Sequence, residues 1–452
     1  MPSSANSAKP PAPLPWRAVF LIVAMIAGGV ALTLYVFYPG VMTYDARFVY
    51  EDMARGVRGD WQSPVMTSLW ELIDPIAPGP GSMFLLIVTL YWLAVGQLAL
   101  VLARRSVWLA LALLLLALSP PAFVFQGIIW RDVLFADSWL LAGVLSLAAA
   151  NHNAKIRVPV QIIALCLLGF GVLLRPNSLT AAPILSVAIF WPARFSWRRA
   201  AIAYVPIGIA LFGLVQLVYY GMLHAERQHP LQQFMIFDLG GISHFAGQNQ
   251  FPITLSASEN ALVTTECYEP TQWDIYWRLE PCEFVMHKLE AEKLFGTSAI
   301  SDAWIHAVIK HPIPYLEHRA AFTWNFLARQ NLTIWTDDVY DPSKKVFPDR
   351  AAFNALVAVY NALEPTPLLR PGTWLLLCIA VSILAWRRRD TPAATFALGV
   401  CGSAAVYVLT FFAVGVASDF RYGYWAVLAG ISGALAIAKG PSRFRGNNRN
   451  MD

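Results

Sequence analysis

Long apolar runs recur along the chain, and they restrict its fold more than any other feature. A helix needs about 17–25 predominantly apolar residues to cross the hydrocarbon core of a bilayer. Ten segments are predicted to be such spans: 18–38, 83–103, 107–130, 133–150, 158–174, 178–191, 200–222, 373–386, 393–416 and 424–438. Because lipid cannot satisfy backbone polar groups, spans of this kind form helices. The sequence therefore predicts an all-α membrane protein. A further apolar segment, 351–363, is interpreted as an interfacial helix or an additional span.

The composition excludes two other classes of protein. Of the 452 residues, 57% are hydrophobic and only 13% are charged, whereas charged residues make up about 25% of soluble domains. A disordered chain needs low hydrophobicity and high net charge, but here the mean hydropathy is +0.51 and the formal net charge is +5. The basic residues lie in short clusters and form no continuous stripe, so nucleic-acid binding is not indicated.

The basic clusters indicate how the predicted helices are oriented, because cytoplasmic loops carry an excess of Lys and Arg. Alternate loops hold these residues: Lys9 and Arg17; Arg104 and Arg105; Lys155 and Arg157; Arg194, Arg198 and Arg199; Arg387, Arg388 and Arg389; and Lys439, Arg443, Arg445 and Arg449. Both termini are therefore predicted to be cytoplasmic. Loops 39–82 and 223–370, with short turns near 131, 175 and 419, are predicted to face the other side, here called the outside.

These assignments divide the chain into five parts. They are a cytoplasmic tail (1–17), a transmembrane bundle (18–222) with the first outside loop (39–82), a mostly helical outside lobe (223–370), C-terminal transmembrane helices (371–438) and a second cytoplasmic tail (439–452). The first span is too long for a signal peptide and lacks a small-residue cleavage motif, so we expect it to remain as a helix.

The cysteines agree with this orientation. Cys267 and Cys282 share the large outside loop, while the other three lie within predicted spans. An oxidising compartment permits a disulfide between this pair, and a loop of about 15 residues closed in this way stabilises by about 3 kcal/mol. We predict the disulfide; the alternative is two unpaired thiols. No spacing of Cys and His typical of a metal site is present.

Charged residues near the spans collect at their outside ends. Arg131 and Asp132, Arg175, and Asp419 with Arg421 all fall there. A transporter is expected to place its binding groups near the bilayer midplane. This distribution instead favours chemistry at the outer membrane surface.

The three arginines could bind a phosphate group at that surface. The outside has no cytosolic nucleotide pool, so a group-transfer enzyme there needs a donor held in the membrane, such as a sugar linked to a polyprenyl phosphate. Guanidinium groups make charge-assisted hydrogen bonds to phosphate oxygens. The alternative is that each arginine snorkels or pairs locally, with Asp132 and Asp419 as the neighbouring carboxylates.

A carboxylate that could act as a general base lies in the first outside loop. Asp45 follows the first span within a few residues, where water and lipid meet. Attack by an acceptor hydroxyl requires a group that takes its proton. The alternative is that 43–56 is a short helix whose dipole Asp45 complements. Glu51 and Asp52 are further candidates, although on a helix they are expected to pair with nearby arginines.

Several short motifs resemble polytopic membrane glycosyltransferases of the GT-C architecture, the group that includes aminoarabinose and protein-mannosyl transferases. "YPGVMTYD" is similar to the family's first outside loop, and "GDWQSPVMTSLWELIDPIAPGPG" to its approach to the second span. "GIIWRDVLFA", "LLRPNSL", "SDFRYGYW", "FDLGGIS" and "AWIHAVIKHPIPYLEHRAAF" resemble segments of bacterial members. The resemblance covers nearly the whole chain apart from its tails. Gln62-Ser63-Pro64 replaces a His-Pro pair common in the family, so a role for that histidine is not expected here.

The resemblance implies an inverting transferase in a bacterial inner membrane. It would move a sugar from a polyprenyl-phosphate donor to an envelope glycan or lipid acceptor on the periplasmic face. Asp45 would be the base. The implied substrate-binding residues are Arg131, Asp132, Arg175, Asn177, Asp419, Arg421 and Tyr422. No cofactor is implied as required, and use of a divalent metal stays open.

The family's outside lobe lies over the bundle and helps to bind the acceptor. In this chain, 302–327 is predicted to be helical with interruptions at prolines, and His318 and Arg319 could face the site. The alternative is that these two residues anchor the helix at the membrane surface.

Three other functions are weighed against the transferase. A polymerase or ligase of lipid-linked glycans would use the same arginines without a base at Asp45. A lipid-sugar flippase or transporter would show charges within the membrane or repeated halves. A non-catalytic scaffold would need none of these residues.

Overall fold

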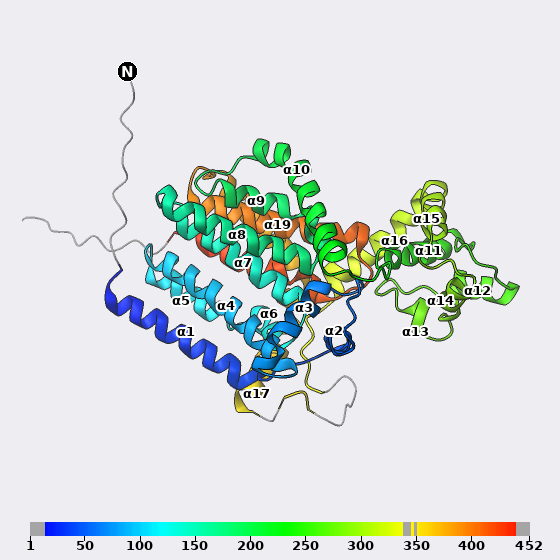
Figure 1. The fold of residues 1–452 in the computed structure, drawn as a ribbon, viewed down its shortest axis with the longest axis horizontal. Coiled ribbons are helices and arrows are strands. Elements are labelled where there is room, and N and C mark those ends of the chain that lie inside the picture. The colour runs from blue at the N-terminus through cyan, green and yellow to red at the C-terminus, as the bar shows by residue number, and fades with distance from the viewer. Residues whose placement is uncertain (1–13, 338–344, 348–349, 440–452) are drawn as a thin grey trace, which may run out of the picture.

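The computed structural model describes residues 14–337, 345–347 and 350–439, and these residues are almost entirely helical (Figure 1). Most of the two predicted tails lies outside the described residues. Within the described ranges only isolated β-bridges occur, and no strand forms. The predicted fold class, an all-α membrane protein, is confirmed.

The helices follow one another along the chain in three groups. The first group is α1 (Trp16–Phe37), α2 (Tyr44–Arg55), α3 (Pro64–Ile73), η1 (Asp74–Ile76), α4 (Pro80–Ala103), α5 (Val107–Leu116), α6 (Pro120–Phe123), η2 (Val124–Gly127), α7 (Arg131–Ala149), α8 (Ala154–Leu174), η3 (Pro176–Thr180), α9 (Ala182–Phe190), α10 (Trp197–Gln216) and η4 (Leu217–Met222). The second is α11 (Gln232–Ala246), α12 (Ala257–Thr265), α13 (Ile275–Arg278), α14 (Phe284–Ala291), α15 (Ser298–Lys310), α16 (Pro312–Trp324) and η5 (Asn325–Arg329). The third is α17 (Ala351–Leu363), η6 (Pro367–Leu369), α18 (Pro371–Trp386), α19 (Pro392–Val414), η7 (Phe420–Gly423) and α20 (Tyr424–Ile437).

Six of these helices are long and apolar enough to cross a membrane: α1, α4, α7, α8, α10 with η4, and α19. Helix α5 and the segment formed by α6 and η2 are long and apolar enough only when taken together, and they are bent by 68°, as in a broken span or a re-entrant loop. The bend lies at Pro120 and Pro121, which cannot continue a regular helix. The predicted count of ten is not confirmed, because α9, α18 and α20 contain only 9, 16 and 14 residues.

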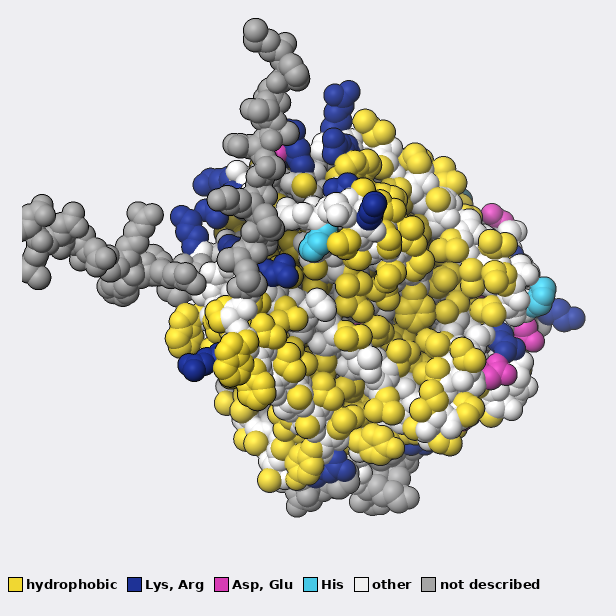
Figure 2. Space-filling model, turned by 60° about the vertical axis from the view of Figure 1, so that its left-hand side comes forward, with side chains coloured by type: hydrophobic (Ala, Val, Ile, Leu, Met, Phe, Trp, Pro, Cys, Tyr) yellow, Lys and Arg dark blue, Asp and Glu magenta, His cyan; other side chains and the backbone are white. Residues whose placement is uncertain are grey.

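The centre of the bundle is α7, and its periphery includes α10. In the most apolar stretch of α7, 89% of the residues are buried, against 6% in α10. Glycines allow close helix contacts around α7, for example Gly171 of α8 against the Trp139 ring. Such small-residue contacts are typical of membrane bundles, where helices gain little from hydrophobic association. Hydrophobic side chains cover most of the face in Figure 2, and charged side chains collect at its edges.

Helices α11 to α16 form a lobe beyond the end of the bundle where α2 and α3 lie (Figure 1). Helix α11 packs on α12, α15 and α16. Cys267 and Cys282 are joined by a disulfide within this lobe, with their Cα atoms 5.4 Å apart. Helix α17 lies elsewhere, against α1 and α6, although it falls inside the predicted lobe 223–370. Its buried Phe353 packs on Phe37 of α1, which explains this placement.

We expect the double change Cys267→Ser and Cys282→Ser to lower the free energy of unfolding of the lobe by about 3 kcal/mol, because the disulfide closes a loop of about 15 residues in the unfolded chain. Denaturant unfolding of the protein in detergent, followed by circular dichroism, measures this. Cys166→Ser is the control, since Cys166 is a free and exposed cysteine on α8. An unchanged unfolding midpoint in the double variant would contradict the expectation.

Candidate functional site

Two short backbone contacts bring the first outside loop against the start of α7. The amide of Val41 donates to the carbonyl of Gly127 at 2.9 Å, and the amide of Ile129 donates to the carbonyl of Val41 at 3.0 Å. The Trp130 indole also donates to the hydroxyl of Thr43 at 2.6 Å. The two backbone bonds satisfy polar groups of the segment between η2 and α7. They also fix where α2 begins, and so place Asp45 beside the N-terminus of α7.

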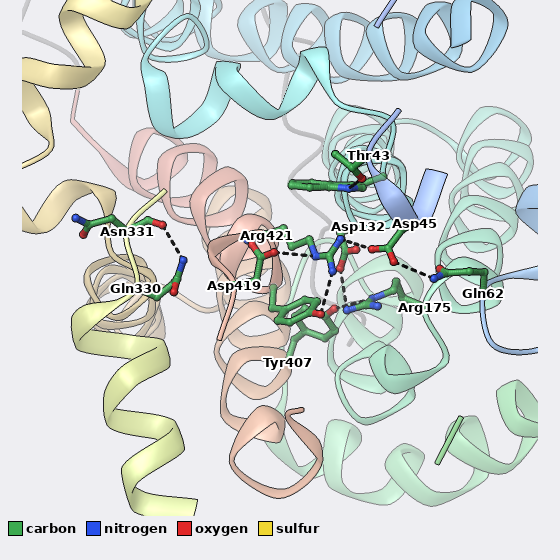
Figure 3. Close-up of polar contacts among 12 residues, drawn as sticks. Thr43, Asp45, Gln62, Asp132, Arg175, Gln330, Asn331, Tyr407, Asp419 and Arg421 are labelled. Atoms are coloured by element: carbon green, nitrogen blue, oxygen red, sulfur yellow. Dashed lines mark hydrogen bonds and ion pairs between the residues drawn. The ribbon is translucent and has the colours of Figure 1, made fainter. Parts of the chain in front are cut away.

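The carboxylate of Asp45, in the first turn of α2, has two side-chain partners (Figure 3). One oxygen forms an ion pair with the guanidinium of Arg421 from η7. The other accepts a hydrogen bond from the Gln62 amide at 3.2 Å. The side chain remains 33% exposed, so its carboxylate is still accessible from outside the protein.

Arg421 is held on three sides. Its Nε lies 3.2 Å from a carboxylate oxygen of Asp419. The other Asp419 oxygen accepts from the Arg421 backbone amide at 2.9 Å and so caps η7. The guanidinium carbon lies 4.8 Å from the centroid of the Trp130 ring, within range of a cation–π interaction. Arg421 therefore joins the carboxylates of Asp45 and Asp419.

A second ion pair lies deeper in the same cluster. Arg175, directly after α8, contacts Asp132 of α7 at 2.8 Å, and both side chains are almost fully buried. Arg175 also reaches the hydroxyl of Tyr407 from α19, at 3.4 Å. The Tyr422 ring lies about equally close to the guanidinium groups of Arg175 and Arg421, at 5.0 and 5.1 Å. The two pairs thus form one network.

Arg131, the first residue of α7, differs from the other two arginines. Its guanidinium donates to the backbone carbonyl of Trp61 at 3.4 Å, and within the described residues it forms no ion pair. The N-terminus of α7 has no side-chain cap. Free amide groups at such a terminus attract anions. Arg131 and this helix end are therefore available to a negatively charged ligand.

A small pocket opens between these groups. Its polar lining is Asp45, Gln62, Arg131 and Asp132, and its apolar lining is Ala46, Val49, Met66, Ile129 and Trp130. The cavity therefore places the carboxylate of Asp45 and the guanidinium of Arg131 around one space.

The surroundings move the pKa values of the two outer carboxyls in opposite directions. Burial alone raises the pKa of Asp45, but the positive charges of Arg421, Arg131 and Arg175 outweigh it and hold this pKa below its usual value. Burial raises the pKa of Asp419, and Arg421 offsets this only in part. Asp45 is consequently ionised at neutral pH and engaged with Arg421.

The structure brings most of the sequence-predicted residues together, although not all. Asp45, Arg131, Asp132, Arg175, Asp419, Arg421 and Tyr422 belong to the network. Asn177 lies nearby in η3, where its carbonyl accepts from Thr180 at 3.3 Å. Glu51 and Asp52 lie further along α2, do not line the cavity, and Asp52 pairs with Arg55 at 2.6 Å.

His318 and Arg319 do not join the network. Both are fully buried in the lobe, where Asp238 of α11 lies between them. Neither residue anchors α16 at a membrane surface either, because neither is exposed. The physical reason is that a charged side chain removed from water needs a counter-charge. Asp238 provides this counter-charge to Arg319 inside the lobe.

Sequence reasoning missed three residues. Gln62 and Tyr407 are neutral, and only their contacts with charged groups single them out. Asp137 lies within the α7 span, fully buried, with the Gln126 amide 3.3 Å from its oxygens. Asp137 is therefore an ionisable residue inside a span, away from the outside ends where Arg131 and Arg175 lie. A carboxylate inside an apolar run was a signal that could have been used.

The described residues contain no group of three or more His, Cys, Asp or Glu side chains arranged to hold a metal ion.

Comparison with known proteins gives one structural likeness. No protein-family model matches the chain, and no curated protein matches it. The crystal structure of the Archaeoglobus fulgidus oligosaccharyltransferase in the apo form is similar with a TM-score of 0.40 and 12% sequence identity. The match covers 93% of this chain and 50% of the archaeal chain, so the chain spans about half the length of that enzyme.

We expect Asp45→Asn to lower the free energy of unfolding by about 1 kcal/mol at neutral pH, the size typical of a partly exposed ion pair. A carboxyl whose pKa is lowered on folding stabilises the protein above its unfolded pKa of about 3.9, and this stabilisation disappears as the pH falls through the folded pKa. The difference between variant and wild type should therefore shrink between about pH 5 and pH 3.

Denaturant unfolding in detergent at several pH values measures this difference. Glu51→Gln, a change at an exposed residue on the same helix, is the matched control. A destabilisation by Asp45→Asn that is independent of pH would show that the charge of Asp45 does not matter.

Proposed function

We propose that the protein is a membrane glycosyltransferase that moves a sugar from a polyprenyl-phosphate donor to an envelope glycan or lipid acceptor on the periplasmic face. The observation that carries the proposal is the shared cavity of Asp45 and Arg131, with Arg421 paired to Asp45 at its edge. A potential base and an anion-binding cation around one space are what sugar transfer from a phosphate requires.

The position of the cavity supports a donor carried by the membrane. It lies where α2 and the N-terminus of α7 meet, at the end of the bundle that also bears the lobe (Figure 1). A phosphate at this depth would lie among lipid headgroups while its polyprenyl chain stayed in the hydrocarbon. The acceptor would approach from the side of the lobe.

In the proposed reaction, a hydroxyl oxygen of the acceptor attacks the anomeric carbon of the donor sugar. The bond from this carbon to the phosphate oxygen breaks, and the polyprenyl phosphate leaves with the bonding electrons. Asp45 takes the hydroxyl proton. A single displacement of this kind inverts the anomeric centre.

The arginines have different proposed roles because their partners differ. Arg131 is in direct ion-pair contact with no carboxylate among the described residues and would bind the phosphate directly. Arg175 is paired with Asp132 on the buried side of the network and would hold Asp132 in position. Fixed positive charge beside a leaving phosphate stabilises the transition state without reorganisation of the site.

Arg421 would change partners when the donor binds. In the present arrangement it holds the carboxylate of Asp45 and keeps its pKa low, which makes Asp45 a weak base. A donor phosphate that attracts Arg421 would weaken this ion pair and raise the pKa of Asp45. The base would then become effective only with the donor in place, which limits hydrolysis without transfer.

The same ion pair favours one alternative, a polymerase or ligase of lipid-linked glycans. Such an enzyme would use the arginines to bind the lipid phosphate and would need no base at Asp45. Asp45 would then serve only to orient Arg421, which its low pKa and direct contact also permit.

A deletion strain complemented with variants tests the proposal. We expect the envelope glycans or lipids of the deletion strain to lack one sugar mass in mass spectrometry, and wild-type protein to restore it. Because a positioned base contributes about 10²–10⁴-fold to rate, Asp45→Asn should reduce the product by at least about 100-fold. Arg131→Gln should also reduce it.

Glu51→Gln should restore the product fully and controls for changes on α2. Membrane levels of each variant are compared by immunoblotting. If Asp45→Asn restores the product while Arg131→Gln does not, the polymerase or ligase replaces the transferase. If deletion changes no sugar mass on envelope glycans or lipids, the proposed transfer to these acceptors is contradicted.

A further inference from the structure

A second buried charge cluster lies in the lobe, outside the cavity at the end of the bundle. Arg319 of α16 contacts Asp238 of α11 through its Nε at 2.6 Å, and neither side chain is exposed. The indole of Trp304 donates to the other oxygen of Asp238 at 2.7 Å. His318 lies 3.3 Å from Asp238. The proposed reaction uses none of these residues.

The cluster contains one fixed positive charge against one carboxylate. Burial lowers the pKa of His318, and the nearby charge of Asp238 does not fully compensate, so this histidine is neutral at pH 7. Arg319 therefore balances Asp238 alone. Burying such a pair stabilises a protein no better than well-packed apolar residues do, so the pair calls for an explanation beyond stability.

Arg319 also reaches out of the lobe. Its Nη1 donates to the backbone carbonyl of Gly415 at 2.7 Å. Gly415 is the residue at which α19 ends, where helix carbonyls lack partners within the helix. The guanidinium of Arg319 thus forms an ion pair within the lobe through Nε and a hydrogen bond to the end of α19 through Nη1.

The lobe holds the residues after Gly415 as well. The amide of Trp273 donates to the carbonyl of Val416 at 2.8 Å, and the amide of Ser418 donates to the carbonyl of Thr271 at 2.6 Å. These bonds form an antiparallel bridge centred on Gln272 and Ala417. Segment 415–418 is therefore fixed to the lobe by three hydrogen bonds.

The next residues of this segment enter the candidate site. Asp419 follows Ser418 directly and both caps η7 and pairs with Arg421. Arg421 in turn pairs with Asp45. Ion pairs, hydrogen bonds and the chain itself therefore connect Asp238, through Arg319 and segment 415–418, to the carboxylate of Asp45.

We propose that the Asp238–Arg319 pair is a positioning unit that fixes segment 415–418 and thereby holds Arg421 against Asp45. Arg319 acts through this segment and touches none of the reacting groups. The pair makes the lobe part of the site's geometry, so that displacement of α11 or α16 displaces Arg421. A catalytic role for this positioning rests on the proposed function. The connection from Asp238 to Arg421 does not depend on that function.

Hydrogen exchange of the full chain in detergent, measured by mass spectrometry, tests the link without any substrate. Arg319→Lys keeps a positive charge beside Asp238, but a single ammonium cannot also reach Gly415 in the same geometry. We expect amides in 415–421 to exchange about tenfold faster in this variant. Asp238→Asn should have the same effect, because it leaves Arg319 without its counter-charge.

Glu259→Gln is the matched control. It breaks another ion pair of the lobe, between Glu259 and Lys288 at 2.6 Å, which lies on α12 and α14 and makes no bond to segment 415–418. It should leave exchange in 415–421 unchanged. Circular dichroism identifies any variant that fails to fold. Unchanged exchange at 415–421 in folded Arg319→Lys would overturn the proposal.

A double-mutant cycle separates positioning from general stability. If Arg319 holds Arg421 in place, the effect of Asp45→Asn on the unfolding midpoint should fall to about half or less in the Arg319→Lys background. A merely structural role predicts that the two effects add, and additivity would overturn the proposal. Both measurements are independent of sugar transfer, so failure of the glycan assay alone would count against the proposed function and leave this link intact.

Discussion

The ion pair between Asp45 and Arg421 is the contact on which the candidate site depends. It joins residues 376 positions apart, the first outside loop and the loop before the last helix. Each loop is held in place by other parts of the chain. The Val41 bridge holds one against the start of α7, and the lobe holds the other after α19.

This arrangement stabilises charged side chains at the end of a membrane bundle. Charged side chains at the end of a membrane bundle are stable only when they are paired or hydrated. The deepest pair, Arg175 with Asp132, is almost dry, whereas Asp45 and Asp419 remain about one third exposed. The network is thus graded from buried to accessible, and the cavity is lined by one carboxylate of each kind, Asp132 and Asp45.

Much of the fold could be predicted because long apolar runs leave few alternatives to helices. Two predicted spans form helices too short to cross a bilayer, and each has a local reason. Pro176 begins the 3-10 turn η3, so the predicted span 178–191 yields only the short helix α9. At the other end of the chain, η7 and α20 are separate elements, and α20 alone is too short to cross.

The sequence predicts which residues belong to the candidate site, but it does not predict which of them form ion pairs. Adjacent residues such as Arg131 and Asp132 suggested local ion pairs, but neighbours along a helix point in different directions. Asp132 instead pairs with Arg175 from another helix. The partnership of Asp238 with Arg319 was invisible for a similar reason, since these residues meet only when α11 packs on α16.

The network at the end of the bundle contains three guanidinium groups and three carboxyl groups, which balance when all are ionised. An anion that entered the cavity would leave this region with surplus negative charge where water is scarce. Uptake of a proton from solution is the simplest compensation, and Asp419, whose pKa burial already raises, is the group most ready to receive it. Affinity for any anionic ligand at this place should therefore weaken as the surrounding solution becomes more alkaline.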